Sequence, residues 1–390
     1  MTGRTETGAA TVLRLCYSAL HVVMRPGYAQ LGHRPKRPGD PRVIEEHVDW
    51  AATMRLRTAM DQRGFGVAEA MDTAQRFHLG WPAARRLITE CGALKLGNGF
   101  CAGAGTDQLT AVRTLADLVD AVVEQCSFIS SHGGIPVILP MPWLCEQDAV
   151  ESDYVDVYAA IVKQVRGPAF VHWLGPMFLP ALAGYFPGRS FERVMALDPT
   201  VVRGCKLSLL DADFEVRTRR QLLAQEQIVL TGDDFHFGRM ILGGDAPPAP
   251  GGGGKLSGTT MIGNRRVALG DWSHALLGIF DAIALPMQQA LRRLAAGDES
   301  GFLRIADRCE ELGRHVFAEP TQHYKAGLAF LAWANGQQQD FTLVNGEELM
   351  RDREHYLRCA ELARAAGAVL DAGEFERRLA DFARVPWPPA

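Results

Sequence analysis

The sequence predicts a (β/α)8 barrel, in which eight parallel strands form a closed sheet and a helix follows each strand. Short apolar runs alternate with stretches of helical period, and no hairpin turn joins one run to the next. A doubly wound sheet usually carries a Gly-rich turn after its first strand, but here the first run continues into Ser18, Ala19, Leu20 and His21. The number of units favours the barrel over an open sheet.

The individual elements follow from the period of the apolar residues. Strands are expected at residues 12–23, 64–71, 99–103, 135–140, 169–173, 202–207, 227–231 and 266–269. Helices are expected at residues 49–62, 81–91, 115–130, 153–165, 217–224 and 237–242, with further helical material up to residue 196. Asp49 is the expected N-cap of the first helix.

Three segments do not fit the alternation of strands and helices. Residues 25–41 are rich in Pro, Gly and basic residues and predict a long loop. Residues 243–263 carry prolines and four consecutive glycines, which predict a mobile rim insertion, either a lid over the mouth or a surface loop. The chain reads as helical from residue 279 to 382. We therefore expect a barrel over residues 11–285 and a C-terminal helical extension over residues 286–390 that packs on it.

The composition is that of a globular protein. The 390 residues are 47% hydrophobic and 22% charged, with a net charge of −4 and no basic stripe, which argues against nucleic-acid binding. Apolar runs are far too short for a membrane span, and the first ten residues lack the apolar core of a signal peptide. Eight cysteines without a CxxC pair indicate buried free thiols. We expect a cytoplasmic homo-oligomer that acts on a small molecule.

Polar and aromatic residues follow almost every predicted strand. They are His21, Glu69, Asp72, Thr73, Thr106, Trp143, His172, Trp173, Lys206, Ser208, Asp233, Asp234, Asp271 and His274. Because a barrel enzyme carries its working groups at the carboxyl ends of its strands, we expect these side chains to meet at one mouth. Each also has a structural alternative: a histidine can bind a backbone carbonyl, an aspartate can cap a helix, and a tryptophan can simply pack.

Lys206 is the strongest candidate for chemistry. It follows residues 201–205 (VVRGC), and strand alternation points its side chain into the barrel. Burial lowers the pKa of a lysine, which frees the amine to attack a carbonyl and form an imine. The alternative is a structural lysine paired with an acidic neighbour such as Asp234.

A family resemblance supports the lysine. Residues 202–208 (VRGCKLS) resemble the sixth strand of the dihydrodipicolinate synthase/N-acetylneuraminate lyase family, which carries its Schiff-base lysine there. Residues 229–234 and 103–106 are similar to that family's seventh strand and third-strand turn, and the helical tail to its C-terminal helices. Residues 67–75 and 172–177 resemble the DUF993 family, a divergent branch. The resemblance implies a class I aldolase.

Two departures from the mainstream family bear on the substrate and on proton transfer. Residues 69–73 (EAMDT) replace a glycine-rich turn that holds the carboxylate of a 2-oxo acid, and two acidic residues argue against that role here. The run 139–144 (LPMPWL) carries Trp143 where the family has a tyrosine that shuttles protons, and an indole cannot do so.

These observations predict a Schiff-base lyase, either an aldolase or a dehydratase, that needs no cofactor. Lys206 forms the imine with a small carbonyl substrate or 2-oxo acid, and His172 or Asp72 is the general acid/base. The other candidates bind substrate, with Ser208 and Thr106 orienting its oxygens. Two alternatives stay open: a divalent-metal barrel enzyme with the ligands Glu69, Asp72, His172 and Asp233, and a catalytically silent small-molecule-binding barrel.

Overall fold

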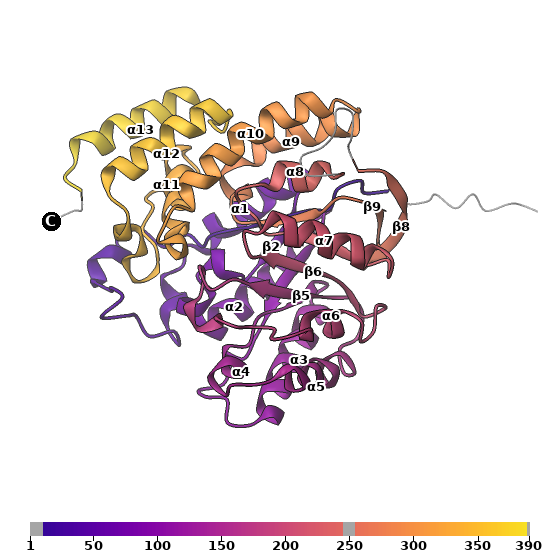
Figure 1. Ribbon diagram of the computed structural model, residues 1–390. Coiled ribbons are helices and arrows are strands. Elements are labelled where there is room, and N and C mark those ends of the chain that lie inside the picture. The colour runs from indigo at the N-terminus through magenta and orange to yellow at the C-terminus, as the bar shows by residue number, and fades with distance from the viewer. Residues whose placement is uncertain (1–10, 245–253, 388–390) are drawn as a thin grey trace, which may run out of the picture.

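The computed structural model describes residues 11–244 and 254–387, and within them eight parallel strands close into a barrel (Figure 1). The predicted fold class is confirmed. The strands follow one another around the barrel in the order β1, β10, β7, β6, β5, β4, β3 and β2. They are β1 (Cys16–Ala19), β2 (Gly66–Glu69), β3 (Phe100–Ala104), β4 (Ile135–Ile138), β5 (Ala169–Leu174), β6 (Val202–Ser208), β7 (Ile228–Thr231) and β10 (His274–Leu277).

Helices connect the strands on the outside of the barrel. They are α1 (Trp50–Gln62), α2 (Arg76–Ala93), α3 (Leu115–Ser131), α4 (Pro142–Glu146), α5 (Glu151–Val162), α6 (Ser190–Met195), α7 (Ala212–Leu223), α8 (Phe237–Leu242) and α9 (Phe280–Ala295). Short 3-10 helices lie at η1 (Tyr28–Leu31), η2 (Ile44–His47), η3 (Asp72–Ala74), η4 (Pro180–Leu182), η5 (Thr321–His323) and η6 (Val344–Met350). Asp49 caps α1 as predicted, because its Oδ1 accepts a hydrogen bond from the Ala52 N–H at 2.9 Å.

Alternation along each strand divides the core into two parts. Tyr17, Val137, Phe170 and Leu230 belong to one apolar cluster, to which neighbouring strands of the barrel contribute. A larger cluster includes Val171 and Cys205, the next residues along β5 and β6, together with residues of the surrounding helices. Lys206 therefore follows the outward-facing Cys205 and points inward, as predicted.

The prediction of the eighth strand was wrong. Residues 266–269 belong to β9 (Arg265–Gly270), which pairs antiparallel with β8 (Leu256–Ile262) through a two-residue turn at Gly263 and Asn264. The backbone φ of Gly263 is 61°, the left-handed region that such turns require. The barrel strand is β10, which begins at His274 and pairs with β1 and β7.

The β8–β9 hairpin closes the amino-terminal end of the barrel. Ile262, Val267 and Leu269 share an apolar cluster with Leu15 and Tyr17 at the start of β1. The prediction of a mobile rim insertion over residues 243–263 is thus wrong for β8, which is an ordered strand far from the mouth; residues 245–253 lie outside the described residues. Figure 1 shows the hairpin and helices α11–α13 on opposite sides of the barrel.

The C-terminal extension reaches the carboxyl ends of β1 and β2 through segments between its helices. These helices are α10 (Glu299–Val316), α11 (Lys325–Ala334), α12 (Arg353–Ala366) and α13 (Ala372–Arg384). The Gln75 amide after β2 bonds both backbone groups of Val344, at 2.8 and 3.2 Å. The boundary expected at residues 285 and 286 falls inside α9, the helix that follows β10. In the described parts of the chain, no helix combines the length and apolarity needed to cross a bilayer.

Stability should fall as the pH rises from about 4.3 through 7, because buried Glu215 on α7 holds a proton in the folded state. Its carboxyl group accepts hydrogen bonds from Ser273 Oγ at 2.6 Å and Thr231 Oγ1 at 3.0 Å, and burial raises its pKa to about 7. The unfolded pKa is about 4.3, so the folded state binds the extra proton, and its stabilising effect is lost as the pH rises through 7. Histidines with lowered pKa values, such as His274, affect stability only below about pH 6.5.

Between pH 6.5 and 8 we expect Glu215 to contribute a loss of roughly 1 kcal/mol in the free energy of unfolding. Urea unfolding at the two pH values measures this loss in the wild type and in Glu215→Gln, which has no proton to lose. The variant should show a smaller decrease. Equal pH dependence of the two proteins would contradict the assignment.

Candidate active site

A small cavity lies at the carboxyl ends of the barrel strands. About 320 Å³ of empty space, part of it open to solvent, lies between its lining residues. Polar groups at the strand ends line it together with apolar groups. Among the apolar groups, Phe317 follows α10 and Phe178 lies between β5 and α6. The lining residues are Met71, Asp72, Thr73, His172, Leu174, Phe178, Lys206, Ser208, Asp234, Gly278, Phe317 and Tyr324. The barrel thus brings together six of the predicted site residues: Lys206, His172, Asp72, Thr73, Ser208 and Asp234.

Lys206 reaches the cavity from the middle of the barrel wall. Its Cα is level with that of His172 on β5 and that of Leu230 on β7. Gly232 leaves room for the lysine stem, because a Cβ at that glycine would lie 3.0 Å from Lys206 Cε and 2.2 Å from Ser208 Oγ. In the described parts of the chain, no carboxylate oxygen lies within the 4.0 Å of an ion pair from Lys206 Nζ.

The electrostatic surroundings of Lys206 favour an uncharged amine. Burial lowers the pKa of Lys206, and the negative charges of Asp234 and Asp72 oppose this shift without reversing it. Burial also raises the pKa of Asp234 to about 7. Asp234 Oδ1 accepts a hydrogen bond from the Ile279 N–H at 3.0 Å, which fixes the carboxyl group at the edge of the cavity.

His172 and Ser208 form a second polar pair in the cavity. His172 Nε2 lies 3.3 Å from Ser208 Oγ, and the buried Nδ1 of the same ring has no hydrogen-bond partner within the described residues. Burial and the positive charge of Lys206 lower the pKa of His172 well below its usual value. The imidazole is therefore neutral at pH 7, with one nitrogen available to a ligand.

Asp72 and Thr73 bind residues of the C-terminal extension. Asp72 Oδ2 lies 3.2 Å from Lys325 Nζ, and Thr73 Oγ1 lies 2.7 Å from Tyr324 Oη. Lys325 also lies 3.5 Å from Glu347. Burial opposes its charge, but the carboxylates of Asp72 and Glu347 raise the pKa of Lys325 above its usual value. Lys325 is thus an ion-paired lysine with a raised pKa, whereas the pKa of Lys206 is lowered.

Three acidic or histidine candidates at the mouth end do not line the cavity, because other protein groups bind them. Glu69 makes two hydrogen bonds, at 2.8 and 2.9 Å, to the buried Arg57 of α1. His21 lies 2.6 Å from Asp281 and 2.7 Å from Gln338. Asp233 accepts hydrogen bonds from the backbone of residues 235 and 236 and from the His236 ring, which holds it in the turn before α8.

Three other predicted substrate-binding residues also lie away from the cavity lining. Trp173 follows the inward-facing His172, so strand alternation turns it outward, where it packs against Phe186, Phe191 and Phe214. Trp143 is a partly buried residue of α4 that packs on the larger apolar cluster, and Thr106 is partly buried in the turn after β3.

His274 and Asp271 lie at the opposite end of the barrel, which corrects their expected place at the mouth. His274 begins β10, and its ring contacts the Leu15 N–H at 2.9 Å and the Ala268 carbonyl at 3.1 Å. Asp271 pairs with Arg219 at 2.9 Å. Both errors arose because β9 was taken for the eighth barrel strand. Residues that follow β9 precede or begin the true strand, β10, and so lie at its amino-terminal end.

The four residues suggested as metal ligands do not converge. Glu69 is bound to Arg57, Asp72 to Lys325, and Asp233 to His236, while His172 faces Lys206 and Ser208. Within the described ranges, one group of side chains does bring possible metal-ligand atoms within 4.8 Å of one another. It consists of His315 on α10 and of His355 and Cys359 on α12. The donor set expected at the mouth is therefore not assembled there.

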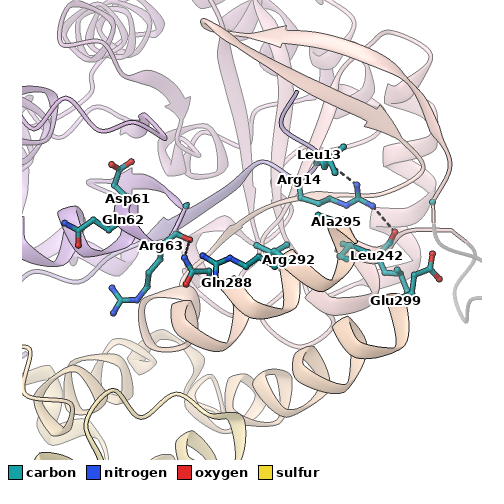
Figure 2. A pocket seen from close by; sticks show the side chains of 14 residues that line it. Leu13, Arg14, Asp61, Gln62, Arg63, Leu242, Gln288, Arg292, Ala295 and Glu299 are labelled. Carbon is teal, nitrogen blue, oxygen red and sulfur yellow. Dashed lines mark hydrogen bonds between the residues drawn. The ribbon is translucent and has the colours of Figure 1, made fainter. Parts of the chain in front are cut away.

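A larger hollow lies near the amino-terminal end of the barrel (Figure 2), with about 1350 Å³ of space that is partly open to solvent. Its lining comes from the segment before β1, the end of α1 and one side of α9. Figure 2 shows Arg14 hydrogen-bonded to the carbonyl oxygens of Leu13 and Leu242, at 3.0 and 3.2 Å. None of the predicted site residues lines this hollow, so the candidate chemistry belongs to the smaller cavity.

The residues that the sequence did not predict come mainly from outside the barrel strands. Tyr324 and Phe317 belong to the C-terminal extension, and Phe178 lies in the connection after β5. Their rings pack together, with Phe317 and Tyr324 stacked at 4.2 Å between centroids. Nothing in the local sequence marks them, because a helical tail does not reveal which of its residues reaches the mouth.

Comparisons with known proteins agree with this architecture. A family model described as "Protein of unknown function (DUF993)" matches residues 2–386, and no curated protein matches the sequence. The dihydrodipicolinate synthase of Bacillus clausii superposes with a TM-score of 0.62 at 12% identity, over 90% of this chain and 97% of that one. That of Oceanobacillus iheyensis gives 0.59 at 12%, over 90% and 95%. The N-acetylneuraminate lyase of Mycoplasma synoviae gives 0.57 at 10%, over 92% and 98%.

Proposed function

The chain belongs to the DUF993 family, and from its barrel and the surroundings of Lys206 we propose that it is a class I aldolase-type lyase. Lys206 forms an imine with a small carbonyl substrate, and the enzyme then cleaves a C–C bond or eliminates water. The observation that carries the proposal is an inward-pointing lysine in a small cavity, with a lowered pKa and no ion pair among the described residues. The fold shared with dihydrodipicolinate synthase and N-acetylneuraminate lyase supports it by analogy.

The contrast between the two lysines near the mouth supports Lys206 as the nucleophile. An imine forms only from an unprotonated amine. Lys325 is held as a cation by Asp72 and Glu347, whereas the pKa of Lys206 is lowered by burial. Lys325 therefore serves to fix Asp72 and the loop after β2.

The imine supplies the electron sink for bond cleavage. Once protonated, it draws the electron pair of the breaking C–C or C–H bond toward nitrogen. His172 is the proposed acid/base group, because it is neutral and its Nδ1 is unpartnered within the described residues. Asp72, the other candidate, is bound to Lys325, so we assign it to this ion pair and not to proton transfer. Ser208 orients a substrate oxygen.

The cavity favours a small, uncharged carbonyl compound over a 2-oxo acid. Met71, Leu174, Phe178 and Phe317 provide apolar contacts. None of the described residues that line the cavity is an arginine, and the nearby Lys325 ammonium is already neutralised by two carboxylates. A substrate carboxylate would have to be buried beside Asp72 and Asp234 without a cation of its own.

Reduction with cyanoborohydride tests the proposal, because it converts an imine to a stable secondary amine. The wild type is incubated with glycolaldehyde, dihydroxyacetone or pyruvate, and the intact mass is compared with that of Lys206→Ala treated identically. We expect a wild-type-specific adduct, faster with the two uncharged compounds than with pyruvate. No adduct beyond that of Lys206→Ala with any of the three would contradict the imine mechanism, and faster reaction with pyruvate would contradict the substrate class.

A further inference from the structure

The C-terminal extension contributes a hydroxyl group to the cavity that holds Lys206. Tyr324 lies at the start of α11, and its side chain lines the cavity together with Lys206, His172 and Asp234. The residue is 4% exposed, and its Oη lies 2.7 Å from Thr73 Oγ1. A buried phenol at this place connects the extension to the turn after β2, where Thr73 and Asp72 are its hydrogen-bond partners.

The ring of Tyr324 is held in a fixed orientation. It stacks on Phe317 with an interplanar angle of 14° and meets Phe178 edge-on at 88°. Gly278, which directly follows β10, leaves the space for it, because a Cβ there would lie 3.1 Å from Tyr324 Cε2 and 3.4 Å from Thr73 Oγ1. Several elements thus combine to position one hydroxyl group over the cavity.

The other polar groups of the cavity are less suited to give a proton to a substrate oxygen. Asp72 is a carboxylate bound to Lys325, and His172 is a neutral ring. Burial and the charge of Asp72 raise the pKa of Tyr324 well above its usual value, so the phenol keeps its proton. The Tyr324 hydroxyl can both donate and accept a hydrogen bond. Its partner, the Thr73 hydroxyl, can also donate and accept.

We propose that Tyr324 is a catalytic residue, which gives a proton to the carbonyl oxygen of the substrate as Lys206 attacks. This inference rests on the proposed imine mechanism. The neutral amine adds to the carbonyl carbon, a C–N bond forms, and the π electrons move to oxygen, which takes the phenol proton. The phenolate takes a proton back from the attached nitrogen. A second transfer of the same kind breaks the C–O bond, and water leaves as the C=N bond forms. Both protons of that water come from the amine, and Tyr324 ends unchanged.

The rate of imine formation with glycolaldehyde tests this role, with cyanoborohydride trapping after increasing times and peptide mapping to Lys206. Tyr324→Phe keeps the ring and its stacking but removes the hydroxyl. We expect the adduct to form about 10²–10⁴ times more slowly and to reach the same final yield. Thr73→Val keeps the phenol and removes its hydrogen bond to the threonine hydroxyl, so it should slow formation less. Tyr356→Phe is the matched control, because that buried hydroxyl bonds the Glu348 carbonyl inside the extension, away from the cavity.

The outcomes separate the two proposals. No wild-type adduct at Lys206 would overturn the imine mechanism, and this inference with it. A wild-type adduct that Tyr324→Phe and Thr73→Val form at the wild-type rate would overturn the role of Tyr324 alone. A purely structural hydroxyl would lower the melting temperature of Tyr324→Phe without changing that rate, so both are measured on the same samples.

Discussion

Lys206→Ala is expected to abolish adduct formation and turnover, with a loss on the order of 10³-fold or more, because it removes the amine proposed to bond covalently to the substrate. The variant should fold, since the lysine ends in a cavity and makes no ion pair within the described residues. Lys206→Arg should fail equally, because a guanidinium stays protonated and cannot form an imine.

The matched control for this prediction is Lys325→Ala, which removes the other lysine near the mouth. It should still form the adduct, because Lys325 is held as a cation by Asp72 and Glu347. Circular dichroism and melting temperature establish that each variant is folded. Full activity of folded Lys206→Arg would mean that the reaction does not pass through an imine on this residue.

The second large effect concerns stability: Arg57→Ala is expected to cost about 3–5 kcal/mol of folding free energy. Arg57 binds both oxygens of Glu69, at 2.8 and 2.9 Å, and the two side chains are fully buried. Removing the arginine leaves a buried carboxylate without its partner. The midpoint of urea unfolding measures the loss.

Arg55→Ala provides the control, because Arg55 lies on the exposed side of the same helix. It should change stability by less than about 0.5 kcal/mol. The double variant Arg57→Met, Glu69→Met should recover much of the stability, since apolar side chains of similar size can replace a buried ion pair. Equal unfolding midpoints for Arg57→Ala and Arg55→Ala would contradict the structural role assigned to Glu69.

Much of the fold could be predicted from the sequence because most barrel strands are bounded by polar turns and followed by amphipathic helices. Helix α1 and its Asp49 cap show how well such local signals work. The eighth strand could not be placed this way, because residues 266–269 are as apolar as a barrel strand. The sequence did contain one signal of a hairpin here. Gly263 and Asn264 are turn-forming residues, and they lie between two short runs that resemble strands.

The candidate site was partly predictable for a related reason. Lys206, His172 and Ser208 lie on inward positions of β5 and β6, so position along a strand predicted where they meet. The same alternation places Trp173 outside. Tyr324 was not predictable, because its place depends on how α10 and α11 pack over the mouth. The ion-pair partners of the acidic residues were not predictable either. Glu69 and Asp72 look alike in sequence, and their roles differ because Glu69 binds Arg57 and Asp72 binds Lys325.

Peptide mapping of the reduced glycolaldehyde adduct tests the central claim most directly. The wild type is treated with glycolaldehyde and cyanoborohydride, digested and analysed by mass spectrometry, and the modified fraction of each lysine is followed over time. We predict that Lys206 is modified first and fastest, well ahead of Lys325 and the exposed lysines. If Lys206 stays unmodified while surface lysines react, its amine is not the nucleophile and the proposed imine mechanism is wrong.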